Sequence, residues 1–325
     1  MIPMGPLFAS QPRLEKICKD RENGFLNSCF TRYTFNSNEN DSITELHDKA
    51  NDLEYLINLC GTTLTCLDVT KYPISHIMPI INSNCPNLEE LYLAFKEIMN
   101  QDFENVFSNL SHLTELSIKW QCENSTIPIT LAKSLEQIGG TLESLYLSRA
   151  LKENDICSPD SLASVFPRLI ALNSLIIRTF GLSQLSLQSI GEIKNLADLQ
   201  LYSYRPENHP MFDTRINMYP IGNLKNLKKL CIDCDYGVRD EFLINLCNNA
   251  KKLTTVSITG TNITDIGMSA IDNLQELEVF YLRSTDRERG SKKNEFITDE
   301  SIQCLFNQKL HILDISSCII PLVKG

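Results

Sequence analysis

The strongest constraint on the fold is an apolar pattern, Leu-x-x-Leu-x-Leu, which the chain repeats ten times with Ile, Val or Phe sometimes replacing Leu. The first positions of successive copies lie 24 to 33 residues apart, and a looser copy over Phe30, Tyr33 and Phe35 precedes them. Repetition at near-constant spacing indicates a repeat protein, in which each unit supplies one piece of a shared core. The copies begin at Leu64, Leu88, Leu113, Leu142, Leu172, Leu196, Leu227, Leu253, Leu277 and Leu310.

The last two apolar positions of each copy are two residues apart, so both side chains lie on one face of a short strand. Between copies, apolar residues recur at helical spacing, for example Ile266, Met268, Ile271 and Leu274. One strand and one helix cannot bury their apolar faces alone, but stacked units can. The sequence therefore predicts an α/β leucine-rich-repeat solenoid of horseshoe shape, with a curved parallel β-sheet on the concave face and helices on the convex face. We expect about 10–11 repeats over residues 30–325, after a short helical cap or remnant over residues 1–29.

A short polar step precedes several of the expected helices. In the stretches "NITDIGMSAI", "ITDESI" and "VRDEFL", the residues Asp265, Asp299 and Asp240 occupy equivalent positions of the repeat. A Thr or Asp at this point can accept hydrogen bonds from the free N–H groups of the first helical turn, and a carboxylate suits the positive helix end. We therefore interpret these aspartates as helix starters and not as catalytic acids.

Composition narrows the class of protein. A hydrophobic fraction of 42% suffices for a sizeable core, and the net charge of -10 argues against a general surface for nucleic acid or anionic membranes. Twelve cysteines without a secretory signal indicate reduced thiols. No apolar run approaches the roughly 20 residues of a membrane helix. We expect a cytoplasmic or nuclear protein that binds neither nucleic acid nor membranes.

No arrangement of residues indicates catalysis or metal binding. Cys231 and Cys234 form a lone Cys-x-x-Cys, without a second pair or a histidine at zinc-ligand spacing. The stretch "DCDYG" lacks the terminal Glu of a calcium loop. The five histidines are scattered over separate repeats. We expect no metal, no cofactor and no enzymatic activity.

Four stretches, "CPNLEELYL" (85–93), "NITDIGMSAI" (262–271), "FITDESIQCL" (296–305) and "LHILDISSC" (310–318), resemble the cysteine-containing repeats of F-box/leucine-rich-repeat proteins, of the ribonuclease-inhibitor-like class. The resemblance covers roughly residues 64–318. It implies that the repeats recognise a substrate protein, while a separate F-box docks on the Skp-type adaptor of an SCF ubiquitin ligase. Residues 1–29 lack the Leu-Pro opening and the late Trp of that box. Adaptor binding would then need a cryptic or upstream F-box, and the chain is expected to be a fragment or a shortened member.

The residues beside each inner apolar pair are expected on the concave face. Because neighbouring strands lie about 4.8 Å apart, one basic and aromatic patch should form across them. Such residue types dominate binding hot spots, and an acidic segment of a partner would complement the charge. The alternative is an ordinary solvated face, with tyrosines that serve sheet propensity. The patch comprises Tyr92, Lys119, Trp120, Tyr146, Arg149 and Arg178, with Tyr202, Tyr281 and Arg283 as further candidates on the same face.

Two inserts, residues 203–220 and 283–295, follow strands and should leave from the same rim, either as binding loops or as tolerated insertions. The favoured function is a non-catalytic protein-interaction module, a substrate-recognition domain of the F-box type. The alternatives are a stand-alone repeat scaffold and a regulator of a small GTPase.

Overall fold

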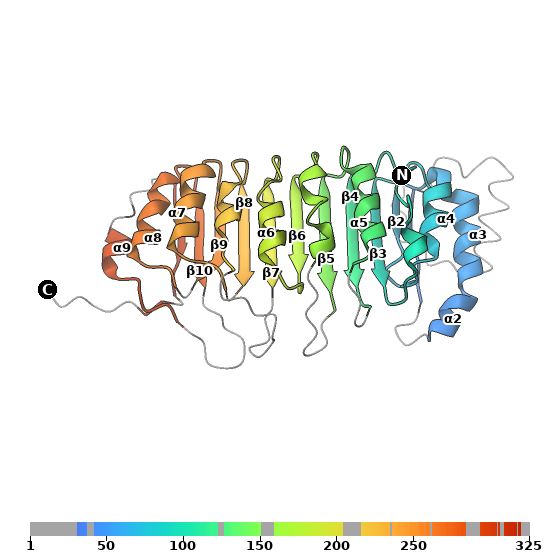
Figure 1. The fold of residues 1–325 in the computed structure, drawn as a ribbon, viewed down its shortest axis with the longest axis horizontal. Coiled ribbons are helices and arrows are strands. Elements are labelled where there is room, and N and C mark those ends of the chain that lie inside the picture. Colours follow the sequence, from blue (N-terminus) through green and yellow to red (C-terminus); the bar gives the residue numbers. More distant parts are fainter. Residues whose placement is uncertain are drawn as a thin grey trace, which may run out of the picture. The chain divides into compact units, whose positions relative to one another are not determined.

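The computed structural model describes residues 31–37, 42–122, 127–150, 159–203, 216–234, 236–260, 262–283, 293–303, 305, 309–316 and 318–319. The chain divides into two compact units, Met1–Ala150 and Leu151–Gly325, which we call unit 1 and unit 2. In each unit a parallel sheet forms one layer and helices with 3₁₀ turns form the other (Figure 1). The chain is an α/β protein of the leucine-rich-repeat class, as predicted.

The described part of unit 1 holds five parallel strands, which follow one another across the sheet in chain order. They are β1 (Arg32–Thr34), β2 (Cys66–Asp68), β3 (Glu90–Phe95), β4 (Glu115–Trp120) and β5 (Ser144–Arg149). Their register aligns the first member of every inner apolar pair. This row consists of Tyr33, Leu67, Leu91, Leu116 and Leu145.

The described part of unit 2 holds six parallel strands in the same simple order. They are β6 (Ser174–Arg178), β7 (Asp198–Ser203), β8 (Lys229–Cys234), β9 (Thr255–Thr259), β10 (Val279–Arg283) and β11 (Ile312–Asp314). The aligned core row consists of Leu175, Leu199, Leu230, Val256, Phe280 and Leu313. All ten copies of the apolar pattern thus coincide with a strand, and the looser copy coincides with β1.

Short helical segments connect the strands. In unit 1 they are α2 (Ile43–Asp48), α3 (Ala50–Cys60), η1 (Gly61–Thr63), α4 (Ile77–Asn84), η2 (Asn100–Phe103), α5 (Ile129–Leu135) and η3 (Glu136–Ile138). In unit 2 they are η4 (Asp160–Leu162), η5 (Phe166–Arg168), α6 (Gln184–Ile190), η6 (Tyr219–Asn223), α7 (Asp240–Asn249), α8 (Asp265–Ser269), η7 (Ala270–Asn273) and α9 (Asp299–Gln303). The elements labelled η are 3₁₀ helices.

One residue expected on the inner face of a helix lies outside. Met268, Ile271 and Leu274 are buried, whereas the side chain of Ile266 is 68% exposed. Two residues separated by two positions point to nearly opposite sides of a helix, so Ile266 and Met268 cannot both face the core.

The inner apolar pair of strands β2 to β10 is buried, as expected. Leu91 and Leu93, for example, are fully buried, which is worth about 1.5–3 kcal/mol for each side chain.

Two of the three aspartates of the polar step, Asp240 and Asp265, join one repeat to the next. The carboxylate of Asp240 accepts hydrogen bonds from the backbone N–H (2.8 Å) and the hydroxyl (2.6 Å) of Thr264. Asp265 accepts the equivalent bonds from Thr298, at 2.9 and 2.8 Å, and a further bond from the Ser301 hydroxyl. The predicted helix cap is provided by Thr264, whose hydroxyl accepts from the N–H of Ile266 at 3.2 Å. These two aspartates therefore tie neighbouring repeats together.

Asparagine side chains connect successive turns at the N-terminal ends of the strands. Asn87, Asn195 and Asn226 each precede the first leucine of a copy and donate to a backbone carbonyl of the preceding turn, at 2.7, 2.7 and 2.8 Å. Each turn is thus held against its predecessor.

The expected cap over residues 1–29 lies outside the described residues, and the prediction of one continuous repeat domain over residues 30–325 stays a prediction. In the described part of the chain, no helix is both long enough and apolar enough to cross a membrane.

Candidate functional site

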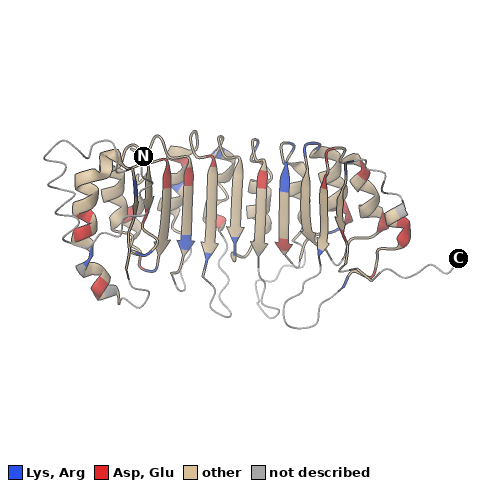
Figure 2. Cartoon of the chain, turned by 180° about the vertical axis from the view of Figure 1, so that it is seen from behind, with Lys and Arg blue, Asp and Glu red and all other residues tan. Residues whose placement is uncertain are grey.

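Each strand turns alternate residues away from the helices. In β4, Leu116, Ile118 and Trp120 are buried, while Glu115, Ser117 and Lys119 reach the surface. We call the sheet surface formed by such outward residues the open face. Figure 2 shows that charged residues on this face gather at the beginnings and ends of strands.

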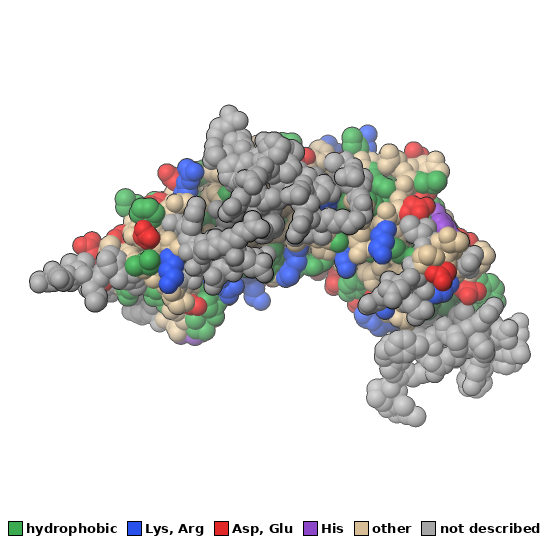
Figure 3. Space-filling view, turned by 90° about the horizontal axis from the view of Figure 1, so that it is seen from below, with side chains coloured by type: hydrophobic (Ala, Val, Ile, Leu, Met, Phe, Trp, Pro, Cys, Tyr) green, Lys and Arg blue, Asp and Glu red, His purple; other side chains and the backbone are tan. Residues whose placement is uncertain are grey.

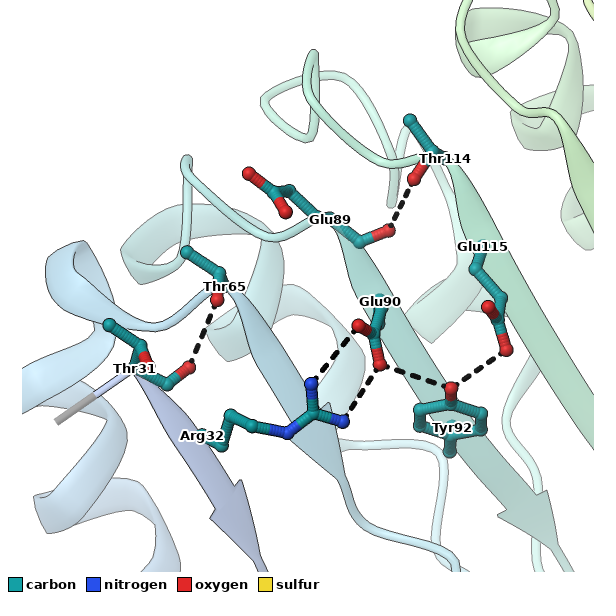
Figure 4. A network of polar contacts seen from close by, with 8 residues as sticks. All are labelled: Thr31, Arg32, Thr65, Glu89, Glu90, Tyr92, Thr114 and Glu115. Atoms are coloured by element: carbon teal, nitrogen blue, oxygen red, sulfur yellow. Dashed lines mark hydrogen bonds and ion pairs between the residues drawn. The ribbon is translucent and has the colours of Figure 1, made fainter. Parts of the chain in front are cut away.

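In unit 1 the open face carries a connected polar cluster at the beginnings of the strands (Figure 4). Arg32 on β1 donates two hydrogen bonds, at 3.1 and 3.0 Å, to the Glu90 carboxylate on β3. The Tyr92 hydroxyl lies within hydrogen-bond distance of two carboxylates, Glu90 at 3.1 Å and Glu115 on β4 at 2.7 Å, and shares its single proton between them. Tyr92 is therefore held between two carboxylates, and its side chain is partly exposed to solvent.

The pKa values of this cluster fix the protonation states at neutral pH. Burial raises the pKa of the Glu90 carboxyl, but hydrogen bonds from Arg32, Cys66 and Tyr92 lower it by more, so it lies below the ordinary 4.5. Burial and the carboxylates of Glu115 and Glu90 raise the pKa of Tyr92 well above 10.0. Tyr92 is a stable donor and Glu90 a stable anion, so the ring is presented in one fixed orientation.

A row of open-face residues extends from this cluster. The register aligns Tyr92, Ser117 and Tyr146 on three neighbouring strands. A small side chain therefore lies between two half-buried aromatic rings. Lys119, two residues after Ser117, is exposed at the end of β4. Three of the predicted patch residues, Tyr92, Lys119 and Tyr146, thus share one surface of unit 1.

Two members of the predicted patch lie inside the protein. The Trp120 side chain is 0% exposed and packs edge-on against Phe95, with ring centroids 6.0 Å apart. Arg149 is 7% exposed. Both follow the inner apolar pair by two residues, so the strand alternation turns them toward the core. Their expected place on the binding surface was wrong.

In unit 2 the open face presents an arginine stacked on a tyrosine. The guanidinium carbon of Arg178 on β6 lies 4.2 Å from the ring centroid of Tyr202 on β7. The Tyr202 hydroxyl donates to Gln200 at 3.1 Å, and Gln200 donates to Asp198 at 3.2 Å. Burial and the neighbouring Cys231 thiol raise the pKa of Tyr202 to about 12, so it remains protonated. Arg178 is exposed and forms no ion pair with a described residue.

The remaining two predicted residues form a similar pair on one strand. Arg283 lies with its guanidinium carbon 5.1 Å from the ring centroid of Tyr281 on β10. Arg178 and Arg283 both end their strands, and Figure 3 looks onto this edge, where Lys and Arg side chains are visible. The structure places Tyr92, Lys119 and Tyr146 on one surface of unit 1 and forms two separate Arg–Tyr pairs in unit 2, with β8 and β9 between them. The predicted continuation from unit 1 to Arg178 stays a prediction.

The patch predicted from the sequence did not include Arg32, Glu90 and Glu115. They occupy the outward position just before the inner pair, whereas the prediction drew only on the position between the two inner residues and on positions after them. The same period-2 alternation identifies them. Their presence matters because it adds two carboxylates to a surface that was predicted to be basic.

The cysteines and histidines form no recognisable chemical centre in the described residues. No group of three or more His, Cys, Asp or Glu side chains is arranged there to hold a metal ion. Cys231 lies on the open face, and Cys234 is buried. Burial raises the pKa of the Cys85 and Cys247 thiols to about 12, so these side chains act as core residues.

The two predicted inserts, residues 203–220 and 283–295, are described only in part, because residues 204–215 and 284–292 lie outside the described residues.

Comparison with known proteins gives distant similarities. No family model matches the chain. A Caenorhabditis elegans protein, named as a candidate RNA-binding protein, is 24% identical over 261 residues, which cover 70% of this chain and 34% of that protein. The chain thus spans about a third of the length of this curated relative.

Three solved structures share similarity in fold at low sequence identity. An internalin, InlF of Listeria monocytogenes, is 19% identical with a TM-score of 0.45, over 82% of this chain and 73% of that one. A Bacteroides fragilis protein is 17% identical with a TM-score of 0.43, over 73% and 68%. A chain from the yeast Rad7 and Elc1 complex is 17% identical with a TM-score of 0.40, over 95% and 89%.

Proposed function

We propose that the chain is a non-catalytic protein-interaction module that binds partner proteins through its open faces. The observation that carries the proposal is the stacking of Arg178 on Tyr202, at the end of two paired strands and without an ion-pair partner among the described residues. A guanidinium stacked on a ring keeps its donors free for a carboxylate, and its orientation is already fixed before binding. Preorganised Arg and Tyr side chains are typical of binding hot spots.

A protein partner fits the charges better than a polyanion does. The open face of unit 1 carries Arg32 and Lys119 against Asp68, Glu90 and Glu115, and that of unit 2 carries Arg178, Lys229 and Arg283 against Asp198, Asp233 and Asp314. A nucleic-acid surface needs an excess of cations. We infer a partner that places an acidic segment at Arg178 and Arg283. RNA is the competing ligand to be tested, because the Caenorhabditis elegans relative is named as a candidate RNA-binding protein.

The finer proposal is substrate recognition of the F-box type in an SCF ubiquitin ligase, in the cytoplasm or nucleus. The four stretches that resemble cysteine-containing repeats support it, with the substrate on the open face and a Skp-type adaptor bound through an F-box elsewhere. A stand-alone scaffold is the alternative if no adaptor binds. Regulation of a small GTPase is the third candidate, which a GTP-hydrolysis assay decides.

The test is quantitative affinity capture from native lysate with the proteasome inhibited, with and without ribonuclease. The open-face variant Arg178→Glu/Tyr202→Ala would be compared with the wild type. Its matched control is Lys133→Glu/Tyr219→Ala, which makes the same types of change at exposed residues of the helical layer. Proteins captured by the wild type and the control, but lost from the open-face variant, are the expected result. Direct binding is then repeated with each purified candidate.

The outcomes separate the proposals. Equal capture by the wild type, the open-face variant and the control variant excludes the Arg178–Tyr202 surface as the binding site. Loss of every partner after ribonuclease treatment overturns protein recognition in favour of RNA. Binding of a purified Skp-type adaptor supports the ligase role, and its absence leaves the scaffold.

A further inference from the structure

Three successive turns that lead into strands of unit 2 are mainly basic, and three that lead into strands of unit 1 are acidic; the next turn of unit 2, which leads into β10, carries Glu276 and Glu278. In unit 2, three successive turns, residues 191–198, 222–229 and 249–255, hold six exposed lysines against Glu192 and Asp198. We call these lysines the lysine edge. They are Lys194, Lys225, Lys228, Lys229, Lys251 and Lys252.

Hydrogen bonds between successive turns hold the lysine edge in one line. Asn226 donates to the Lys194 carbonyl at 2.8 Å, and the Lys252 ammonium donates to the Asn226 side chain at 2.9 Å. The N–H groups of Lys228 and Lys229 both donate to the Ala197 carbonyl, at 2.8 and 3.0 Å. Because adjacent turns are bonded directly, their lysines follow one another at about the 4.8 Å spacing of the strands.

The corresponding turns of unit 1, residues 84–90, 110–115 and 139–144, contain no lysine or arginine. They carry carboxylates instead, which we call the glutamate edge. It comprises Glu89, Glu90, Glu115 and Glu143. In Figure 2 red lies at the beginnings of β3 and β4, and blue lies at the beginning of β8.

The repeat frame provides an internal comparison. Glu89 and Lys228 both stand two residues before the first inner leucine of their strands, and Glu90 and Lys229 stand one residue before it. The same backbone position therefore accepts either sign of charge, and the fold requires neither. The clustering of lysines in three successive turns of unit 2, and of glutamates in three successive turns of unit 1, calls for an explanation outside the stability of the repeat.

We propose that the lysine edge of one copy binds the glutamate edge of a second copy of this chain. The two edges are opposite in sign and have the same spacing from turn to turn, so several charge pairs can form in one register. Glu90 is already paired with Arg32, and Glu115 with Tyr92, within the chain. An acidic segment of another protein, or an RNA, would engage the lysine edge alone and leave Glu89 and Glu143 of the glutamate edge unmatched. Only a second copy supplies complementary charges for both edges. This inference goes beyond the proposed function and does not depend on it.

The test is sedimentation velocity of the full chain over a concentration series, at low salt (about 20 mM) and at about 300 mM, where exposed charges are screened. The wild-type sedimentation coefficient should rise with concentration at low salt, with an association constant at least about tenfold weaker at high salt. The variants Lys228→Glu/Lys229→Glu and Glu89→Lys/Glu143→Lys should each remain monomeric alone. Mixed together, they should associate, because each then meets an edge of opposite charge.

The control variant is Lys96→Glu/Lys133→Glu, which changes the net charge equally at exposed lysines of unit 1 outside either edge. It should associate within about twofold of the wild type. The proposal is overturned if the wild type stays monomeric up to about 200 µM at low salt, if the control variant is as impaired as the lysine-edge variant, or if the mixture of the two edge variants fails to associate. Thermal unfolding of every variant confirms that each one is folded.

Discussion

The carboxylate of Asp240 lies against Gly267, so close that a methyl group at this glycine would overlap its Oδ1 atom. The same carboxylate binds Thr264, three residues before Gly267. The absence of a side chain at position 267 thus allows one repeat to reach the helix start of the next. The contact joins residues of two different repeats.

Replacing Gly267 with alanine should destabilise the protein by about 1–3 kcal/mol, because the added methyl displaces Asp240 from Thr264. Alanine is otherwise the better helix former, so a local propensity effect alone would give the opposite sign. Urea unfolding of the variant measures the change in free energy. Gly140→Ala is the control, since a Cβ there meets nothing within 4 Å, and it should be neutral or slightly stabilising. An unchanged midpoint for Gly267→Ala would show that the Asp240 contact is dispensable.

Trp120 should report on the core of unit 1. It is the single tryptophan of the chain and is fully buried beside Phe95. We expect native emission that is blue-shifted and shielded from iodide, and a loss of about 3–5 kcal/mol for Trp120→Ala. Tyr146→Ala, on the open face, should cost much less. Strong iodide quenching of the native protein would contradict the inward placement of the indole.

Asp265 should make stability depend on acid pH. Burial raises its pKa, but hydrogen bonds from Ser301 and Thr298 lower it by more, so the folded-state pKa lies below the ordinary 3.8. The resulting stabilisation is present above the unfolded-state pKa and is lost as the pH falls through the folded-state value. Asp265→Asn should therefore cost about 1–2 kcal/mol near neutral pH, and its difference from the wild type should shrink below about pH 4.

Urea unfolding between about pH 7 and pH 3 measures this difference. Asp299→Asn is the matched control, since Asp299 occupies the same frame but its Oδ1 has no hydrogen-bond partner in the described structure. This control should change stability little at any pH. A constant penalty for Asp265→Asn over the whole range would rule out the carboxylate as the source.

The buried thiols should resist alkylation in the folded state. With a pKa of about 12, each of Cys85 and Cys247 is a thiolate in roughly one molecule in ten thousand at pH 8. Iodoacetamide labelling followed by peptide mass spectrometry should find both unlabelled until urea unfolds the chain. Cys231, on the open face, provides the internal comparison and should react first. Labelling of Cys85 at the rate of Cys231 would contradict its place in the core.

The repeat made the strands, their order and their buried pairs predictable, because a spacing of two residues fixes which side chains share a face. Leu91 and Leu93, or Leu116 and Ile118, follow directly from it. Trp120 and Arg149 were misplaced because this rule was not extended to them: each is the third alternate residue of its strand and turns to the core with the inner pair. Alternation was sufficient to place these two residues correctly, so the error lay in the interpretation.

Contacts between repeats were not predictable in this way. Arg32 and Glu90 are 58 residues apart, and Asp265 and Thr298 are 33 apart. A repeat length that varies from 24 to 33 residues hides which side chains of neighbouring units meet. Asp265 was therefore interpreted as a cap of its own helix, although its carboxylate binds the following one. The charges of the lysine edge were visible in the sequence, but their alignment required the register of the turns.

The bonds from Thr264 to Asp240 and from Thr298 to Asp265 all point in one direction along the chain. In each case the acceptor belongs to the earlier repeat and the donors to the later one. During synthesis, which proceeds from the N-terminus, every acceptor thus leaves the ribosome before its donors do. Each of these carboxylates is therefore already available when the donors of the following repeat emerge, so the bonds between repeats can form in the order in which the chain is made.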